Sequence, residues 1–368
     1  MLESLLALNS LPKIGPVRIR RLLDRFGSAE QALRAPKDRL LGVDGIGPEL
    51  ATILTDWESH ADPVAELREI RQRGLSVVLP DDPAFPRALR DSYDCPLLLY
   101  VWGRLEERDR HAIGIVGTRR SSTYRKHCTK KLAYQFARAG FTVVSGLARG
   151  VDTTAHEAAL AAEGRTVAVI GSGLARIFPG ENLPLAERIA DGHGAIVSEF
   201  PLHTAPDKQT FPQRNRIVAA WSRAVVVTEC PAWSGSLITA NLATEYGRPV
   251  YAVPGPIDKP TSAGCHRLIR EGATLLTDAS ELLEDLNGLP FPAEVPVKAD
   301  APPAEPPDLP PLPEEEAQIL SALGDSESGI DALVEHTGLA APIVSATLLK
   351  LEMKRLVRPL PGFRYVRR

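Results

Sequence analysis

The chain has 368 residues, a formal net charge of −3 at pH 7 and a pI of about 6.3, so it is not a polycation. Any nucleic-acid site must therefore be a local patch of positive charge, because the chain as a whole does not attract a polyanion. The length predicts two or three domains with enough residues for a large buried core.

The cysteines and the N-terminus indicate the class of protein. Four cysteines, Cys95, Cys128, Cys230 and Cys265, show no CxxC spacing. This argues against a zinc site and against a disulfide framework, and it suits a reducing compartment. No basic segment precedes an apolar core at the N-terminus, and no apolar run is long enough to span a bilayer. We therefore expect a soluble cytoplasmic protein with no metal ion, no cofactor and no membrane contact.

Residues 1–75 are predicted to form a helical domain, because apolar residues recur there at helical spacing. Two segments, Leu11–Val17 and Val43–Pro48, place glycines directly before such helices. Both resemble helix-hairpin-helix units, whose glycine turn can present backbone N–H groups to a phosphate. Two interpretations stay open: the hairpins contact a DNA backbone, or they are turns of a packing module. Acidic residues beside the second hairpin favour packing.

Residues 76–288 are predicted to form a Rossmann-like domain. The candidate strands are Leu75–Leu79, Pro96–Trp102, Ala112–Val116, Thr142–Val144, Thr166–Ile170, Ala195–Val197, Ala224–Val227, Val250–Val253 and Thr274–Leu276. Apolar strands that alternate with helices are typical of a doubly wound, mostly parallel α/β sheet. Ligands of such sheets bind at the carboxyl ends of the strands. Gly117, Ser145, Ser172 and Ser234 follow different strands, so we expect them to converge at this edge.

The segment Val143–His156, VVSGLARGVDTTAH, is the most informative of these strand ends. A buried strand leads into a small-residue loop with one arginine, and Asp152 then offers a helix cap. A glycine loop ahead of a helix can direct backbone N–H groups at a phosphate. The alternative is a tight turn that binds nothing.

The loops lack the sequence motifs that bind two common ligands, nicotinamide dinucleotides and ATP. The first parallel strand is followed by GIVGTRR instead of a GxGxxG fingerprint, and no GxxxxGK[ST] loop occurs. The edge is instead rich in arginine: Arg119, Arg120, Arg149, Arg176, Arg214 and Arg216. Arginine beside small residues suits phosphate, because its planar fork donates two hydrogen bonds and keeps its charge. Several such positions along one edge predict a polyanionic ligand.

Eight motifs follow one another in this order: VGTRR, SGLARGVDTTAH, AVIGSGLARIFPGEN, SEFP, FPQRNRIVA, SGSLITA, YAVPGP and AGCHRLIREGATLL. Together they closely resemble the DprA/Smf family of DNA-processing proteins over roughly residues 80–286. The resemblance implies a single-stranded DNA-binding protein, not an enzyme, with a SAM-like N-terminal domain and a C-terminal winged helix. It further implies a homodimer that protects incoming DNA and loads a RecA-type recombinase during natural transformation.

The family motifs can be carried over residue by residue. The expected binding edge comprises Gly117, Thr118, Arg119, Ser145, Gly146, Arg149, Arg214, Asn215, Arg216, Ser234, Gly235 and Ser236. Arg120, Ser172 and Gly173 lie in loops at the same strand ends and complete the candidate set. Family members often carry a basic residue in the segment that matches Phe178–Asn182, where this chain has none. Lys208, near the RNR motif, is the candidate to compensate.

A nucleotide-cleaving enzyme is the alternative function, with Asp152, His156, Glu199 and Glu229 as candidates for acid–base chemistry. The related phosphoribohydrolases resemble this sheet and carry a PGGxGT signature with a glutamate. The matching segment here is Trp233–Thr239, WSGSLIT, which lacks that signature. We therefore favour structural roles for the four residues: a helix cap for Asp152 and backbone contacts for the two glutamates.

The C-terminal part begins with a Pro-rich linker at residues 289–313, which is expected to be extended and flexible. Residues 314–368 then predict three helices and a hairpin, the pattern of a winged helix. Basic residues gather on its third helix and wing: Lys350, Lys354, Arg355, Arg358, Arg364, Arg367 and Arg368. Contact with duplex or junction DNA, protein interaction and packing alone stay open as its role.

Apolar residues at the end of the Rossmann-like domain supply a candidate dimer surface: Leu268, Ile269, Leu275, Leu276, Leu282, Leu283 and Leu286. One face of each helix packs on the sheet, and this density could leave apolar surface for a partner. The alternative is that all of them are core. On the dimer hypothesis, a charge at Leu282 or Leu283 should give a folded monomer.

Overall fold

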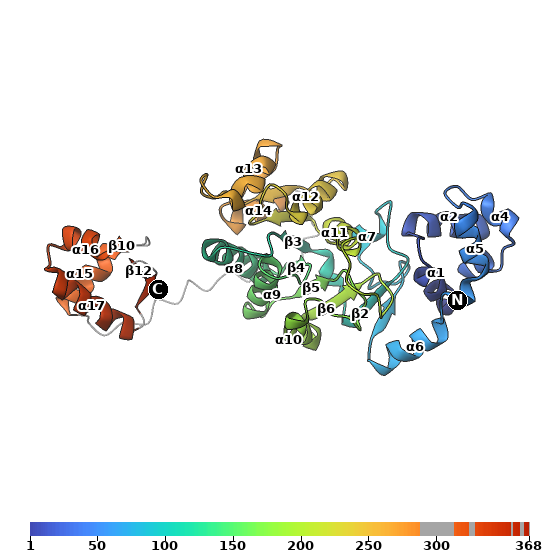
Figure 1. Cartoon of the computed structure of the whole chain (residues 1–368), viewed down its shortest axis with the longest axis horizontal. Helices are drawn as coiled ribbons and strands as arrows, with labels where there is room; N and C mark the ends of the chain where they lie inside the picture. The colour runs from blue at the N-terminus through green and yellow to red at the C-terminus, as the bar shows by residue number, and fades with distance from the viewer. Residues whose placement is uncertain (288–312, 324–327, 355, 361–363, 368) are drawn as a thin grey trace. The chain divides into compact units, whose positions relative to one another are not determined.

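The computed structural model describes residues 1–287, 313–323, 328–354, 356–360 and 364–367. The chain divides into two compact units, Met1–Lys298 and Ala299–Arg368 (Figure 1). Most of the predicted linker, residues 289–312, lies outside the described residues. The three boundaries between the four segments proposed from the sequence stay predictions.

The first 75 residues are helical. Their helices are α1 (Leu2–Ser10), α2 (Pro16–Phe26), α3 (Ala29–Leu33), α4 (Lys37–Leu41), α5 (Pro48–Thr55) and α6 (Pro63–Gln72). In each predicted hairpin a proline opens the second helix after a glycine, Gly15 or Gly47. Proline is favourable there because the first N–H groups of a helix have no intrahelical partner. Leu8, Leu22 and Leu40 are fully buried in the core that these helices share, which confirms the predicted helical domain.

The N-terminal helices are joined to the sheet by buried contacts. Leu6 of α1 packs with Leu98 and Tyr100 in one apolar cluster. The Glu66 carboxylate of α6 accepts hydrogen bonds from the Tyr100 hydroxyl (2.9 Å) and from the backbone N–H of Leu202 (3.1 Å). Burial and this carboxylate both raise the pKa of Tyr100. These contacts explain why residues 1–75 belong to the same compact unit as the sheet.

The sheet has nine strands among the described residues. They are β1 (Ser76–Val78), β2 (Leu99–Gly103), β3 (Ala112–Val116), β4 (Thr142–Ser145), β5 (Thr166–Val169), β6 (Gly194–Ser198), β7 (Ala224–Val227), β8 (Val250–Ala252) and β9 (Thr274–Leu275). Their order is β1-β2-β6-β5-β4-β3-β7-β8-β9. The pairs β1–β2 and β2–β6 are antiparallel, and the other pairs are parallel. The order reverses between β3 and β7, and such a switch point favours ligand binding outside the strand ends.

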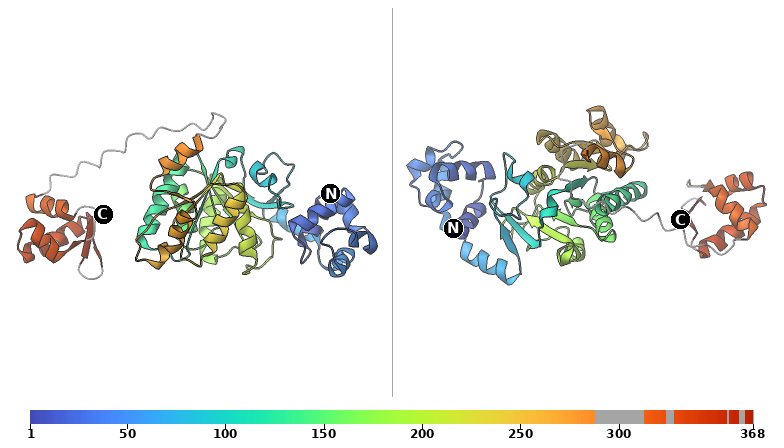
Figure 2. Two further views of the ribbon diagram at one scale, coloured as in Figure 1. Left: turned by 90° about the horizontal axis from the view of Figure 1, so that it is seen from above. Right: turned by 180° about the vertical axis from the view of Figure 1, so that it is seen from behind.

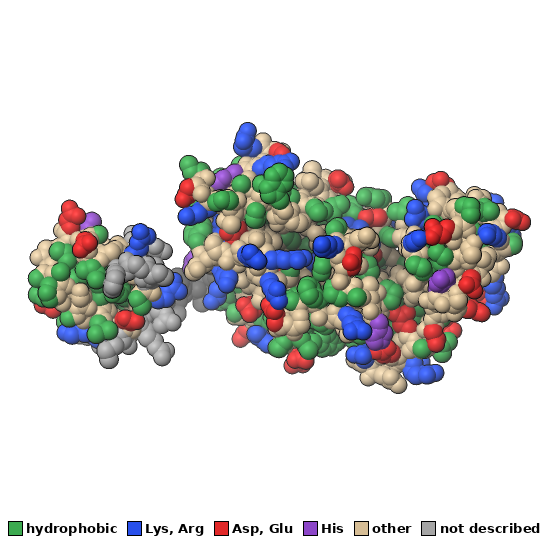
Figure 3. Space-filling model, in the orientation of Figure 1, with side chains coloured by type: hydrophobic (Ala, Val, Ile, Leu, Met, Phe, Trp, Pro, Cys, Tyr) green, Lys and Arg blue, Asp and Glu red, His purple; other side chains and the backbone are tan. Residues whose placement is uncertain are grey.

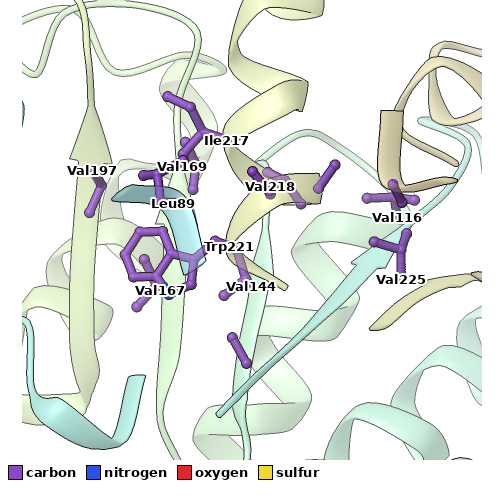
Figure 4. Packing of buried hydrophobic residues seen from close by; sticks show 14 of the residues in the cluster. Leu89, Val116, Val144, Val167, Val169, Val197, Ile217, Val218, Trp221 and Val225 are labelled. Atoms are coloured by element: carbon purple, nitrogen blue, oxygen red, sulfur yellow. The ribbon is translucent and has the colours of Figure 1, made fainter. Parts of the chain in front are cut away.

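Helices cover both faces of this sheet (Figure 2). On one side lie α8 (Thr123–Arg138), α9 (Val151–Ala161), α10 (Leu183–Arg188) and α14 (Ala279–Asn287). On the other lie α7 (Arg87–Arg90), α11 (Thr210–Trp221), α12 (Gly235–Glu245) and α13 (Ala263–Arg270). Figure 4 shows Trp221 and Val218 of α11 among the strand valines, and the Trp221 indole donates to the Asp109 carbonyl (2.8 Å). The predicted doubly wound, mostly parallel sheet is confirmed.

Most leucines of the candidate dimer surface are core residues. Leu276 and Leu282 have no exposed surface, and Leu286 is 1% exposed. Leu275 is 45% exposed, and Leu283 is partly buried against the same cluster. A charge at Leu282 would enter the core, so the expectation that this variant is a folded monomer is wrong. Dimerisation itself stays a prediction, with the partly exposed Ile269, Leu275 and Leu283 as its candidates.

The C-terminal unit is a winged helix, as predicted. Its elements are α15 (Glu314–Leu323), β10 (Ser328–Gly329), α16 (Ile330–Thr337), α17 (Ala341–Met353), β11 (Val357–Leu360) and β12 (Arg364–Arg367). Two antiparallel pairings give the strand order β10-β12-β11. Of the predicted basic residues, Lys354 donates to the Glu316 carboxylate (2.6 Å). Arg355 and Arg368 lie outside the described residues.

Within the described parts of the chain, no single helix is long and apolar enough to cross a membrane. Ile330–Thr337 and Ala341–Glu352 meet that criterion only as a pair, bent by 109°. Both helices contribute to the core of the C-terminal unit, through residues that include Leu333 and Leu348.

Candidate functional site

A cleft of about 640 Å³ lies at the carboxyl ends of β3, β4 and β7, at the point where the strand order reverses. Its walls are the loops after these strands, the start of α11 and the first turns of α12. Eleven of the predicted site residues line it: Gly117, Thr118, Arg119, Arg120, Gly146, Lys208, Arg214, Asn215, Ser234, Gly235 and Ser236. In Figure 3, Lys and Arg side chains form a row across the middle of the unit Met1–Lys298, beside a hollow. Of the four residues predicted to converge, Gly117 and Ser234 both line the cleft, whereas Ser145 and Ser172 do not.

Glycines allow the loops to approach one another. A Cβ on Gly117 would lie 2.5 Å from the Val151 side chain and 2.9 Å from the Glu229 carbonyl. The next N–H, of Thr118, donates to that same carbonyl (2.8 Å), and the Thr118 carbonyl accepts from Val151 (3.2 Å). Gly150 has a φ of +80°, a conformation that favours glycine. These contacts join the β3, β4 and β7 loops into one rim.

Three exposed cations stand on this rim. Arg119, Arg120 and Lys208 make no ion pair with any of the described residues. The Arg119 guanidinium lies 5.0 Å from the centre of the Phe211 ring, within the range of a cation–π contact. Cations without an ion-pair partner can contact the phosphates of a nucleic-acid backbone.

Arg214 lies beneath the cleft instead of reaching into solvent. The side chain is 5% exposed, and its Nη1 donates to the carbonyls of Gly146 (2.5 Å) and Val169. Burial lowers its pKa to about 10, so it stays charged at neutral pH. Arg214 thereby ties together the ends of β4 and β5, and its charge adds to the positive field of the cleft.

Asp152 organises the loop between β4 and α9. Its carboxylate accepts from the backbone N–H groups of Gly146 (3.1 Å) and Ala148 (3.3 Å). Burial raises its pKa, against the attraction of the Arg214 charge. The expectation that Asp152 caps α9 is wrong, because Gly150 is the N-cap and Asp152 bonds to the preceding loop instead.

Five predicted site residues do not line the cleft: Ser145, Arg149, Ser172, Gly173 and Arg216. The Ser145 hydroxyl donates to the Ile115 carbonyl (2.6 Å), and the Ser172 hydroxyl donates to the Arg176 carbonyl (2.8 Å). The glycine is packed so closely that a Cβ would lie 2.1 Å from two carbonyl oxygens. The assignment of Ser145, Ser172 and Gly173 as DNA contacts stays a prediction without support from the geometry of the cleft.

The two arginines outside the cleft are both paired with carboxylates. Arg149 donates to Glu181 through Nε (2.7 Å) and Nη2 (2.6 Å), and both residues are exposed. Arg216 is buried and pairs with Glu199, while its Nη1 donates to the Asp94 carbonyl (2.6 Å). A surface pair is readily opened, whereas a buried pair is not. Arg149 therefore stays a candidate for DNA contact, whereas the buried pairing of Arg216 gives no support to its assignment, which stays a prediction.

The candidates for acid–base chemistry are engaged in structural contacts. His156 is fully buried, and its Nδ1 lies 2.7 Å from the Thr166 hydroxyl, which itself donates to the Val143 carbonyl. Nδ1 must therefore carry the proton, and burial lowers the pKa of His156 to about 3. Burial raises the pKa of Glu199 despite its pairing with arginine. Glu229 is fully buried and accepts from the Ser122 N–H (2.9 Å).

Sequence reasoning missed the aromatic members of the cleft. Phe211 and Trp233 line it, and Phe211 also lies 5.9 Å from the Phe178 ring. A signal for both existed, since each aromatic stands only one to three residues before a candidate motif, SGS or RNR. Aromatic rings beside cations are a recurring feature of single-strand binding grooves.

Three family models match successive parts of the chain. Residues 76–287 match DNA recombination-mediator protein A, residues 302–362 the DprA winged helix domain, and residues 5–56 a SAM-like helix-hairpin-helix tandem. Protein Smf of Synechocystis sp. is 36% identical, over 99% of this chain and 98% of that protein.

Solved structures agree with these matches. DNA processing protein A from Streptococcus pneumoniae is 32% identical with a TM-score of 0.69, and the match covers 77% of this chain and 98% of that one. DNA processing protein A from Helicobacter pylori, described for its single-stranded DNA binding mode, is 31% identical with a TM-score of 0.53, over 58% of this chain and 96% of that one. The chain belongs to the DprA/Smf family of DNA-processing proteins, whose central domain is that of DNA recombination-mediator protein A.

Proposed function

We propose that this protein binds single-stranded DNA in the cleft at the β3, β4 and β7 strand ends. The observation that carries the proposal is the set of exposed, unpaired cations that line this cleft, Arg119, Arg120 and Lys208. The likeness to the Helicobacter pylori protein supports it, because that relative was described for its single-stranded DNA binding mode.

The composition of the cleft supports a backbone-directed mode of binding. Arginine and lysine contact phosphates without regard to sequence, so affinity should depend on salt more than on base order. Bases of a single strand can turn away from the backbone onto aromatic rings, whereas paired bases cannot. We therefore expect single strands to bind better than duplex at this site.

In the cell we propose that the bound strand is protected and passed to a RecA-type recombinase during natural transformation. The protein would act as a cytoplasmic homodimer with no catalytic activity of its own. The family membership supports this role, and the buried, hydrogen-bonded states of Asp152 and His156 support the absence of acid–base chemistry.

Fluorescence anisotropy with a labelled thymidylate strand and a labelled hairpin of equal phosphate number tests the binding proposal. Tighter binding of the unstructured strand is expected, and equal affinities would refute the proposed mode. Incubation with nucleoside monophosphates tests the enzymatic alternative, because released base would show nucleotide cleavage. Recombinase loading is tested by the rate at which a RecA-type protein forms filaments on a strand already covered by single-strand-binding protein, with and without this chain.

A further inference from the structure

Trp233 differs from the other three tryptophans of the first unit in its exposure. Its side chain is 95% exposed, whereas Trp221 is fully buried and Trp57 and Trp102 are partly buried. Aromatic rings normally bury a large apolar area, so a ring left in water at the rim of a cleft is an unused contact surface. Trp233 lies on the wall of the same cleft as Arg119 and Lys208.

The backbone that carries Trp233 is held by local hydrogen bonds. The Ser234 N–H donates to the Pro231 carbonyl (3.2 Å), which closes a turn around the tryptophan. The Ser234 hydroxyl then accepts from the Ser236 N–H (3.3 Å) and caps α12. This ring is therefore presented from a fixed turn at the start of a helix, so little backbone ordering is needed when a ligand binds.

The surroundings of Trp233 favour a nucleobase over an apolar protein segment. Gly235, two residues after Trp233, has open space where a side chain would stand, and this leaves the first turn of α12 accessible. Exposed cations line the same cleft, and so does Phe211, with Arg119 over its ring. A phosphate chain at the cations places its bases within the same cleft, where their flat faces match the indole.

We propose that Trp233 is a stacking platform for an unpaired base of the DNA strand bound in this cleft. The inference rests on the proposed single-strand binding and adds a base-recognising contact to a site otherwise built for phosphates. Every base has a π face, so the contact requires unpaired bases without reading their sequence. Trp233 thus contributes to the discrimination between single strand and duplex.

The test compares a thymidylate 12-mer with an abasic strand of equal length, which has the same phosphates and no bases. Wild-type protein should bind the thymidylate strand more tightly, by roughly 5- to 150-fold for one stacked base. Trp233→Ala should lose most of the preference for the thymidylate strand and keep its affinity for the abasic strand. Trp233→Phe, which still carries an aromatic ring, should retain most of that preference. The tryptophan emission that differs between wild type and Trp233→Phe should be quenched by the thymidylate strand alone.

Ile257→Ala is the matched control, because Ile257 is 94% exposed but does not line the cleft. This variant should bind both strands as wild type does. Equal weakening of both strands by Trp233→Ala, or no effect on either, would overturn the inference and leave single-strand binding intact. An unchanged DNA affinity with lost binding of the recombinase would assign Trp233 to a protein contact instead. Failure of the wild type to bind either strand would refute the proposed function itself.

Discussion

Replacement of Arg119 by alanine should reduce the salt dependence of DNA binding by a predictable amount. Three exposed cations line the cleft and make no ion pair with a described residue: Arg119, Arg120 and Lys208. Arg214, in contrast, donates hydrogen bonds to two backbone carbonyls. Each phosphate contact on a single strand adds roughly 0.7 to the slope of log affinity against log salt. Three contacts give a slope of about −2, or an approximately 18-fold loss of affinity between 50 and 200 mM salt.

The Arg119→Ala variant should have a slope of about −1.4, so the same change of salt should cost it approximately 7-fold. Anisotropy titrations with a fluorescent 12-mer at four salt concentrations measure both slopes. Arg87→Ala is the matched control, because Arg87 is an exposed arginine that does not line the cleft. An unchanged slope for Arg119→Ala, or an equal change for Arg87→Ala, would remove Arg119 from the DNA path.

Three further predictions concern regions around and beyond the cleft. Glu181→Gln should release Arg149 from its exposed ion pair and raise single-strand affinity at low salt; unchanged affinity in anisotropy titrations would place Arg149 off the DNA path. Truncation after residue 287 should leave the melting transition of the remaining chain nearly unchanged in calorimetry, because few contacts cross a Pro-rich linker; a large drop would show that the tail docks. The pKa of His156 is lowered from 6.5 to about 3 in the folded protein, so the unfolded state takes up the proton first and stability falls as pH falls below 6.5. His156→Gln should therefore reduce the stability lost between pH 7.5 and 5.5 by about 1.4 kcal/mol in urea unfolding; an equal loss in both proteins would show that His156 does not titrate between the two states.

The sequence by itself determined the architecture and predicted the edge of the sheet at which the candidate site lies. Apolar strands such as Ala112–Val116 and Ala224–Val227 are buried along their whole length, and only a sheet covered on both faces accommodates them. Parallel strands place all their carboxyl ends on one edge, so loops distant in sequence, at Gly117 and at Ser234, had to meet. Both conclusions depend on local periodicity and on sheet geometry, which are readable without any side-chain contact.

Only the tertiary structure decided which side chains of these loops face a ligand. Arg119, Arg149 and Arg216 all belong to motifs of the expected binding edge, yet the first makes no ion pair with a described residue, the second is paired with Glu181 and the third is buried against Glu199. Each outcome depends on a carboxylate, or its absence, contributed by a distant segment. The sequence shows the type of a residue and the end of its strand, whereas the charge available to a ligand depends on partners that only the folded chain brings within hydrogen-bond distance.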